Sequence, residues 1–305
     1  MYPILELPYE AWDRPEQLGT KMKFWFQADG TKTMFKAGRP GTGENWSEKA
    51  TCELAGLLGL PHAHYDLASW HDHAGNPVQG VITPSFVAPD ARLVLGNEII
   101  GPMVNTEAAR ERFYKQSYHT ARLVMTVLAS SNVKPPEMDP AFPFPQSKDM
   151  FVGYILFDAW IGNQDRHSEN WGLIVSQDSS IGLAPTYDHA SSLGRNESDE
   201  KRLIRLRTKD KGQSIDYYVT KATSALYKGS KDPKPLSTLD AFTECARHSP
   251  TAAAYWLDKL NQVQIEDVAT IFTQIPRSFI TEVAVEFAIK MLEINKKRLL
   301  DCIRL

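Results

Sequence analysis

The sequence predicts an α+β protein with two lobes, a small β-rich N-terminal lobe over residues 1–87 and a mostly helical C-terminal lobe over residues 88–305. Three observations support this division. The 305 residues are enough for more than one compact core. Alternating strand patterns are concentrated before residue 84, and helical patterns dominate after it. Between the two regions, Pro84 and Pro89 bracket a connector that cannot continue a helix.

The N-terminal lobe is predicted to begin with a β-hairpin. Residues 22–28 alternate, and Asp29-Gly30 is typical of a type I′ turn. The apolar residues on one face of this strand are Met22, Phe24 and Phe26. The return strand over residues 31–36 ends at Lys36. About 20 residues precede the first predicted strand.

A glycine-rich loop and a helix follow the hairpin. The loop runs from Gly38 to Glu44, and the helix is expected over residues 46–58. Asn45 is a candidate N-cap with Glu48 at the capping-box position. Gly59 is expected to end the helix. Two more strands, over residues 63–69 and 78–84, complete the lobe.

The C-terminal lobe is predicted to be mostly helical. Its expected helices cover residues 105–130, 149–162 and 281–300, and its short strands cover residues 172–175 and 182–185. A proline-rich loop is expected over residues 131–146, and residues 189–215 are expected to be mobile because charge and hydroxyl groups dominate them.

Composition excludes several classes of protein. A net charge of -3 predicts no direct nucleic-acid binding and no attraction to an anionic membrane. No apolar run approaches the roughly 20 residues of a membrane span. The three cysteines are far apart and odd in number, and the N-terminus lacks a signal-peptide pattern. We therefore expect a cytoplasmic protein with reduced thiols.

Three polar residues carry the candidate chemistry. Asp165 follows a buried helix, Asn170 lies five positions later, and Asp188 follows the next pair of strands. Phosphoryl transfer needs one carboxylate aimed at the nucleophile and oxygen ligands that hold Mg²⁺ against the phosphates of ATP. Asp165 suits the first task, and Asn170 and Asp188 suit the second. Taken alone, Asp165 could equally be a helix cap or half of a structural ion pair.

The wider pattern resembles a known family. Asn163-x-Asp165-Arg166-His167-x-x-Asn170-x-Gly172, followed by Leu183-Ala184-Pro185-x-Tyr187-Asp188, is similar to the catalytic motifs of HipA-like bacterial serine/threonine kinases. The resemblance covers roughly residues 30–195 and implies a bilobal, protein-kinase-like fold of the phosphatidylinositol-kinase type. It also implies ATP and Mg²⁺ as cofactors. The short N-terminal region resembles that of compact members of the family.

The resemblance implies further roles in nucleotide binding. Lys36 should contact the α and β phosphates, and Glu48 should pair with it, with Glu53 as a weaker rival. The backbone N–H groups of Gly41, Thr42 and Gly43 are expected to face phosphate, and Ser85 and Phe86 are expected to face adenine. The competing interpretations are a solvated lysine, a capping-box glutamate and an ordinary flexible loop.

Four more residues have candidate roles. His167 is a candidate for orienting Asp165, with a structural role as the alternative, and Arg166 is expected to anchor the loop through an ion pair. In this family a serine near the nucleotide can be autophosphorylated. Ser47 and Thr42 are the hydroxyl-bearing residues available for that modification.

The resemblance implies a serine/threonine protein kinase that acts as the toxin of a HipA-type toxin–antitoxin system. Its first expected partner is a protein substrate, for which family examples are translation factors and aminoacyl-tRNA synthetases. The other expected partners are a HipB-like DNA-binding antitoxin and a separate polypeptide that carries the N-terminal region. The alternatives are a lipid or small-molecule kinase of the same fold and a non-catalytic binding module. A lipid kinase needs a membrane-facing segment, for which Lys201 to Arg207, alternating like a strand, is the candidate.

Overall fold

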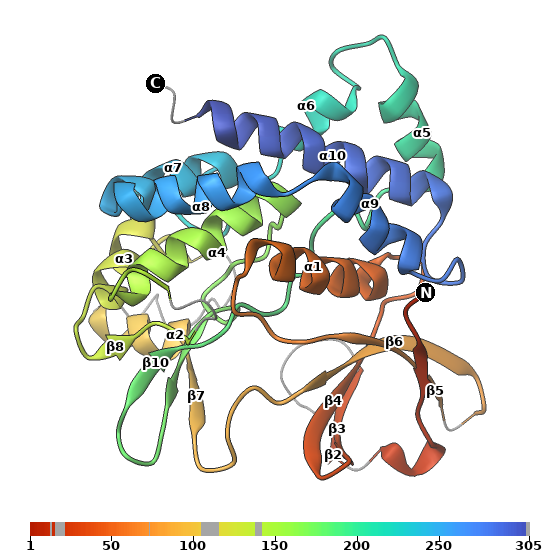
Figure 1. Ribbon diagram of the computed structural model, residues 1–305, viewed down its shortest axis with the longest axis horizontal. Helices are drawn as coiled ribbons and strands as arrows, with labels where there is room; N and C mark the ends of the chain where they lie inside the picture. The colour runs from red at the N-terminus through yellow and green to blue at the C-terminus, as the bar shows by residue number, and fades with distance from the viewer. Residues whose placement is uncertain (13, 16–21, 73, 105–115, 138–141, 303–305) are drawn as a thin grey trace.

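The computed structural model describes residues 1–12, 14–15, 22–72, 74–104, 116–137 and 142–302. It contains a six-stranded sheet, a four-stranded sheet and a helical assembly (Figure 1). The six-stranded sheet has the order β1 (Ile4–Glu6), β5 (Asp66–His71), β6 (Pro77–Pro84), β4 (Thr31–Ala37), β3 (Lys23–Ala28) and β2 (Arg14–Pro15). The mixed architecture with a β-rich N-terminal part confirms the predicted fold class.

The predicted β-hairpin is present as β3 and β4. Asp29 and Gly30 both have positive φ, 48° and 77°, as a type I′ turn requires. Phe24 and Phe26 are buried with Phe35 and Trp70 in a small core on one face of the sheet. Met22, which the alternation places on the same face, is 40% exposed and is not part of that core.

The residues before the hairpin form more structure than the sequence indicated. β1 pairs in parallel with β5, and the 3-10 helix η1 (Tyr9–Ala11) and β2 follow it. The N–H of Tyr2 donates to the carbonyl of Gln274, 2.7 Å away in the C-terminal half. The first strand therefore begins at Ile4, and the chain start joins the two halves of the molecule.

Helix α1 (Glu44–Leu58) lies between the six-stranded sheet and the helices of the C-terminal part (Figure 1). It packs on β5 and β6 on one side and on α8 (Pro250–Gln262) and α9 (Ile265–Gln274) on the other. Gly43 occupies the N-cap position, so the predicted capping by Asn45 was wrong. Glu48 therefore lies one turn inside the helix, and its carboxylate does not take part in capping the helix.

The second sheet has the order β7 (Arg92–Leu95), β9 (Gly172–Val175), β10 (Ile181–Leu183) and β8 (Val133–Lys134). The chain leaves β6 at Pro84 and enters this sheet at Arg92. We therefore propose that the lobe boundary lies in this connector, between residues 87 and 88.

Helix α4 (Ser147–Ile161) is the centre of the C-terminal part. All of its residues except Lys148 are buried. It packs against α3 (Ala121–Leu128), α7 (Thr238–His248), α8 (Pro250–Gln262) and α10 (Glu282–Asp301). Gly162 ends it with φ 67°, a left-handed conformation that glycine adopts without strain. The segment that follows α4 is therefore anchored on a rigid base.

The remaining described helices are short: α2 (Gly96–Ile100), η2 (Gly101–Met103), α5 (Asp199–Arg207), α6 (Ile215–Val219) and α9 (Ile265–Gln274). Of the helix predicted over residues 105–130, residues 105–115 lie outside the described part, and α3 begins only at Ala121. The strand-like interpretation of Lys201–Arg207 was wrong, because this stretch lies in helix α5. Ser198 caps a helix there by accepting from the N–H of Lys201.

None of the helices in the described part is long and apolar enough to cross a membrane.

Candidate functional site

A cleft of about 440 Å³ lies where the two sheets face each other. β3, β4 and β6 line one side, and β7, the segment after α4 and the Tyr187-Asp188 pair line the other. Among the predicted site residues, the lining includes Lys36, Ser85, Phe86, His167, Asn170 and Asp188.

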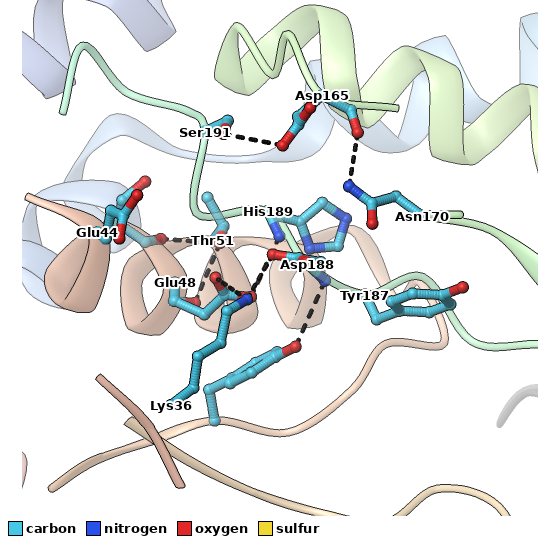
Figure 2. Close-up of polar contacts among 12 residues, drawn as sticks. Lys36, Glu44, Glu48, Thr51, Asp165, Asn170, Tyr187, Asp188, His189 and Ser191 are labelled. Atoms are coloured by element: carbon cyan, nitrogen blue, oxygen red, sulfur yellow. Dashed lines mark hydrogen bonds and ion pairs between the residues drawn. The ribbon is translucent and has the colours of Figure 1, made fainter. Parts of the chain in front are cut away.

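Lys36 joins the two sides of this cleft. Its Nζ lies 2.5 Å from Oδ1 of Asp188 and 3.5 Å from Oε2 of Glu48, as Figure 2 shows. Burial alone would lower the pKa of Lys36, but the carboxylates of Asp188 and Glu48 outweigh it and raise that pKa above its ordinary value. Lys36 is therefore a buried, permanently charged cation. Glu53, the weaker candidate for this pairing, binds Lys49 instead at 2.6 Å.

The backbone around Asp188 is held in an unusual conformation. Asp188 has φ 57°, which places its carboxylate toward Lys36 while the chain turns. Its N–H donates to the hydroxyl of Tyr65 at 3.4 Å, and the N–H of His189 donates to Oε1 of Glu48 at 3.1 Å. Glu48 thus contacts both the lysine and the segment that carries Asp188. This arrangement ties helix α1 to the position of Asp188.

The segment after α4 folds as a tight loop. The N–H of Asp165 donates to Oδ1 of Asn163 at 3.1 Å, and Nδ2 of Asn170 donates to the carbonyl of Asp165 at 2.6 Å. Because the amide nitrogen of Asn170 is used in this bond, its oxygen is the atom suited to a cation. Asn170 lines the cleft, whereas Asp165 lines a neighbouring cavity of about 350 Å³.

Arg166 locks the loop in place. Its buried guanidinium binds both carboxylate oxygens of Asp158, at 2.7 and 2.8 Å. It also donates to the carbonyl of Asn170 at 2.6 Å and to Oγ1 of Thr186 at 2.9 Å. The predicted anchoring ion pair is confirmed, and it connects helix α4, the loop and the strand that leads to Asp188.

His167 lies beside Asp165. Its Nε2 is 3.6 Å from Oδ1 of Asp165, which is longer than a hydrogen bond. The N–H of Glu169 donates to its Nδ1 at 3.2 Å and fixes the ring. The ring of His167 and the carboxylate of Asp165 are therefore neighbours in the loop.

The glycine-rich loop has a different position from the one expected. The N–H of Thr42 donates to the carbonyl of Arg39 at 3.1 Å, and the N–H of Gly43 donates to the carbonyl of Arg195 at 3.0 Å. Neither these two residues nor Gly41 line the cleft. Ser47 is fully buried inside α1, and its hydroxyl donates to the carbonyl of Ser192 at 3.3 Å. In this structure the loop packs against residues 192–195.

A series of side-chain contacts that we did not predict connects this loop to Asp165. The buried carboxylate of Glu44 binds Arg195, which donates to Oγ of Ser191 at 3.0 Å. The hydroxyl of Ser191 in turn donates to Oδ2 of Asp165 at 3.3 Å (Figure 2). Glu44 and Arg195 are 151 positions apart, so no local pattern could have joined them. The only available signal was an acidic residue in the first turn of a helix.

The connector forms one wall of the cleft. The N–H of Ser85 donates to the carbonyl of Lys32 at 2.8 Å, which fixes the connector on β4. The ring of Phe86 stacks on Tyr187 with centroids 5.4 Å apart. A flat apolar surface next to backbone polar groups fits a planar base.

The residues present fit a Mg²⁺ ion that is shared with phosphates. Asn170 and Asp188 both line the cleft and offer oxygen ligands. The described residues contain no cluster of three or more groups that could hold a metal alone. Mg²⁺ in phosphate-transfer sites commonly uses one or two protein ligands and completes its shell with phosphate and water.

The buried His119, which lies beside Trp171, is expected to make the stability of the protein depend on pH. The indole N–H of Trp171 donates to Nε2 of His119 at 3.0 Å, and burial lowers the pKa of His119 to about 4. The unfolded chain binds this proton near pH 6.5, so stability is lost as the pH falls from about 6.5 toward 4. We expect about 1 kcal/mol of this loss by pH 5.5. Urea unfolding at pH 7.5 and 5.5 should show a smaller difference for His119→Gln than for the wild type; equal differences would contradict the assignment.

The family model for the HipA-like C-terminal domain matches residues 18–264. The fold is similar to that of the proinflammatory kinase CtkA of Helicobacter pylori, with a TM-score of 0.70, 18% identity, and coverage of 98% of this chain and 99% of that one. It is also similar to a chain in the complex of the toxin–antitoxin proteins HipA and HipB of Shewanella oneidensis MR-1 with operator DNA, with a TM-score of 0.51 and 14% identity. That match covers 96% of this chain and 67% of the other. No curated protein matches the sequence significantly.

Proposed function

Because the chain belongs to the HipA-like C-terminal domain family, we propose that it is an ATP-dependent serine/threonine protein kinase. The observation that carries the proposal is the position of Lys36 between Glu48 and Asp188, in a cleft that also contains Asn170. Residues from four separate parts of the chain meet there. Their types and mutual contacts are those that phosphoryl transfer from ATP requires.

In the proposed mechanism, ATP enters the cleft with its base against Ser85 and Phe86. Lys36 binds the α and β phosphates, and Glu48 holds Lys36 in place. Asn170 and Asp188 supply oxygen ligands for Mg²⁺, which neutralises phosphate charge when bound. The backbone of Gly41, Thr42 and Gly43 reaches phosphate only if the loop leaves its contacts with residues 192–195.

The reacting hydroxyl is activated by Asp165. Its oxygen attacks the γ-phosphorus, its proton passes to the Asp165 carboxylate, and the bond between the γ-phosphorus and the bridging oxygen breaks to release ADP. Ser191 and His167 orient the Asp165 carboxylate through the contacts described above.

We further propose that the kinase is the toxin of a cytoplasmic HipA-type toxin–antitoxin system. The fold similarity to a chain of a HipA–HipB–operator complex supports a HipB-like antitoxin as a partner. A separate polypeptide carrying the N-terminal region is a second proposed partner. Ser47 is a proposed autophosphorylation site only if α1 opens locally, since its hydroxyl is buried, whereas Thr42 is partly accessible.

The decisive test is Asp165→Asn. We expect this change to lower phosphate transfer from ATP to proteins of a bacterial lysate by about 10²–10⁴-fold, because the base is removed. Mass spectrometry of phosphosites identifies the acceptors, and induced expression should slow growth with wild type but not with the variant. Transfer by wild type no greater than by Asp165→Asn would refute a protein kinase. Transfer only to lipids or small molecules would favour the alternative kinase class.

A further inference from the structure

The cavity beside Asp165 is distinct from the nucleotide cleft. It has a volume of about 350 Å³, and its polar lining includes Ser191, Arg195 and Lys221. Lys36, Asn170 and Asp188 line the nucleotide cleft and not this cavity. The two hollows are therefore separate, and the loop after α4 contributes to both, with Asp165 in one and Asn170 in the other.

This position suits the group that receives the phosphate. In phosphoryl transfer the attacking and leaving oxygens lie roughly in line on opposite sides of phosphorus. ATP occupies the cleft in the proposed function, so the acceptor has to reach Asp165 from elsewhere. The second cavity is lined by Asp165 itself.

The charged lining of the cavity is mostly cationic. Apart from Asp165, its charged residues are Arg195 and Lys221. Glu44 neutralises Arg195 from behind. Lys221 is an exposed residue that follows α6, and its Nζ lies 4.2 Å from the centroid of the Tyr217 ring. Within the described part of the chain, Lys221 forms no ion pair with a carboxylate. Lys221 is therefore the cation best placed to select a ligand by charge.

The lining of the cavity also includes apolar side chains and a serine whose hydroxyl has no hydrogen-bond partner among the described residues. Val219, Ala222 and Met291 supply apolar surface. The buried Oγ of Ser192, which lines the cavity, has no hydrogen-bond partner among the residues that the structure describes. Buried polar groups normally have a partner, so this hydroxyl keeps a hydrogen-bonding capacity that the described residues leave unused.

We propose that this cavity binds the acceptor segment of a protein substrate and selects an acidic residue next to the phosphorylated serine or threonine. The inference rests on the proposed kinase function. The cavity volume is at the small end of the roughly 300–1,000 Å³ of ligand pockets. It suits one or two side chains of a polypeptide rather than a lipid. A carboxylate of the substrate would face Lys221 while its hydroxyl faces Asp165.

The test uses the full chain and serine-centred peptides that are identical except for one Asp, Asn or Lys within two positions of the serine. We expect wild type to show a kcat/KM about five- to tenfold higher for the Asp peptide than for the Lys peptide, the effect of one partly screened charge pair. Lys221→Glu should abolish or invert this preference. Lys228→Glu, an exposed lysine outside the cavity with the same change of charge, should keep it.

Two results would overturn the inference in distinguishable ways. Transfer that depends on Asp188 but is indifferent to peptide charge, or a preference that Lys221→Glu leaves unchanged, contradicts the acceptor cavity alone. Absence of transfer by wild type to every peptide and every lysate protein contradicts the proposed function and the acceptor cavity with it.

Discussion

Asp188→Asn is expected to lower phosphate transfer by about 10³–10⁵-fold, the range found when transition-state charge stabilisation is removed from phosphoryl transfer. The asparagine keeps the shape of the side chain but loses the negative charge that we propose as a ligand of Mg²⁺. It also weakens the contact at 2.5 Å that orients Lys36. Both effects weaken the binding of the phosphates of ATP and leave the contacts of the acceptor hydroxyl unchanged.

Asparagine is the informative replacement at this position. Asp188 has φ 57°, and asparagine tolerates this left-handed conformation better than alanine does. Asp188→Ala would therefore add a backbone cost to the loss of charge. Lys36 keeps Glu48 as a partner, and the side chain of Asp188 is 33% exposed. We expect stability to change by no more than about 1–2 kcal/mol.

Initial rates with labelled ATP, together with thermal melts, check this prediction. Asp178→Asn, in the exposed turn between β9 and β10, is the matched control and should keep the wild-type rate. Calorimetry should show that ATP binding by Asp188→Asn no longer depends on Mg²⁺. A variant that retains both the rate and the Mg²⁺ dependence would refute the assignment of Asp188 as a metal ligand.

The polar residues of the candidate site were predictable because each is marked by local sequence. Lys36 ends an alternating strand, Asp165 and Asn170 flank a tight loop, and Asp188 follows two short strands. Their residue types have few other reasons to occur at this spacing. The fold class followed from the same local periodicities.

The contacts around Asp165 were not predictable, because they join residues that are distant in sequence. Asn45 and Glu44 both offer polar side chains at the start of α1, and short-range rules favour Asn45 as a cap. Glu44 instead binds Arg39 and Arg195, so its carboxylate stabilises the first turn from outside the capping position. The same long-range packing moves the glycine-rich loop away from the cleft.

Helix α5 was interpreted as a strand because its basic residues are interspersed with apolar ones. Leu203, Ile204 and Leu206 alternate with arginines in a way that also fits a strand. Arg202 is nonetheless buried, pairs with Asp199 three residues earlier at 2.7 Å, and lies over Trp46. An i, i+3 ion pair fits a helix and not an extended strand, and the long basic side chain on the buried face made the helical pattern hard to recognise.

The largest effect on stability is expected from Asp158→Ala. Arg166 is 1% exposed, and Asp158 supplies both acceptors of its bidentate pair. Removal of Asp158 leaves a buried guanidinium without its counter-charge, and we expect a loss of about 3–5 kcal/mol in the free energy of unfolding. Glu293→Ala, which breaks the exposed pair with Lys290, is the control and should cost less than about 1 kcal/mol.

The double variant Asp158→Leu with Arg166→Met separates folding from catalysis. Replacement of a buried pair by apolar side chains of similar size is often close to neutral, so we expect most of the lost stability to return. Transfer activity should stay at least about 100-fold below wild type, because the carbonyl of Asn170 and the hydroxyl of Thr186 lose the donor that positions the loop. Urea unfolding and initial rates of phosphate transfer measure the two quantities. If activity returns together with stability, Arg166 is needed only for folding, and the loop needs no guanidinium to place Asp165 and Asn170.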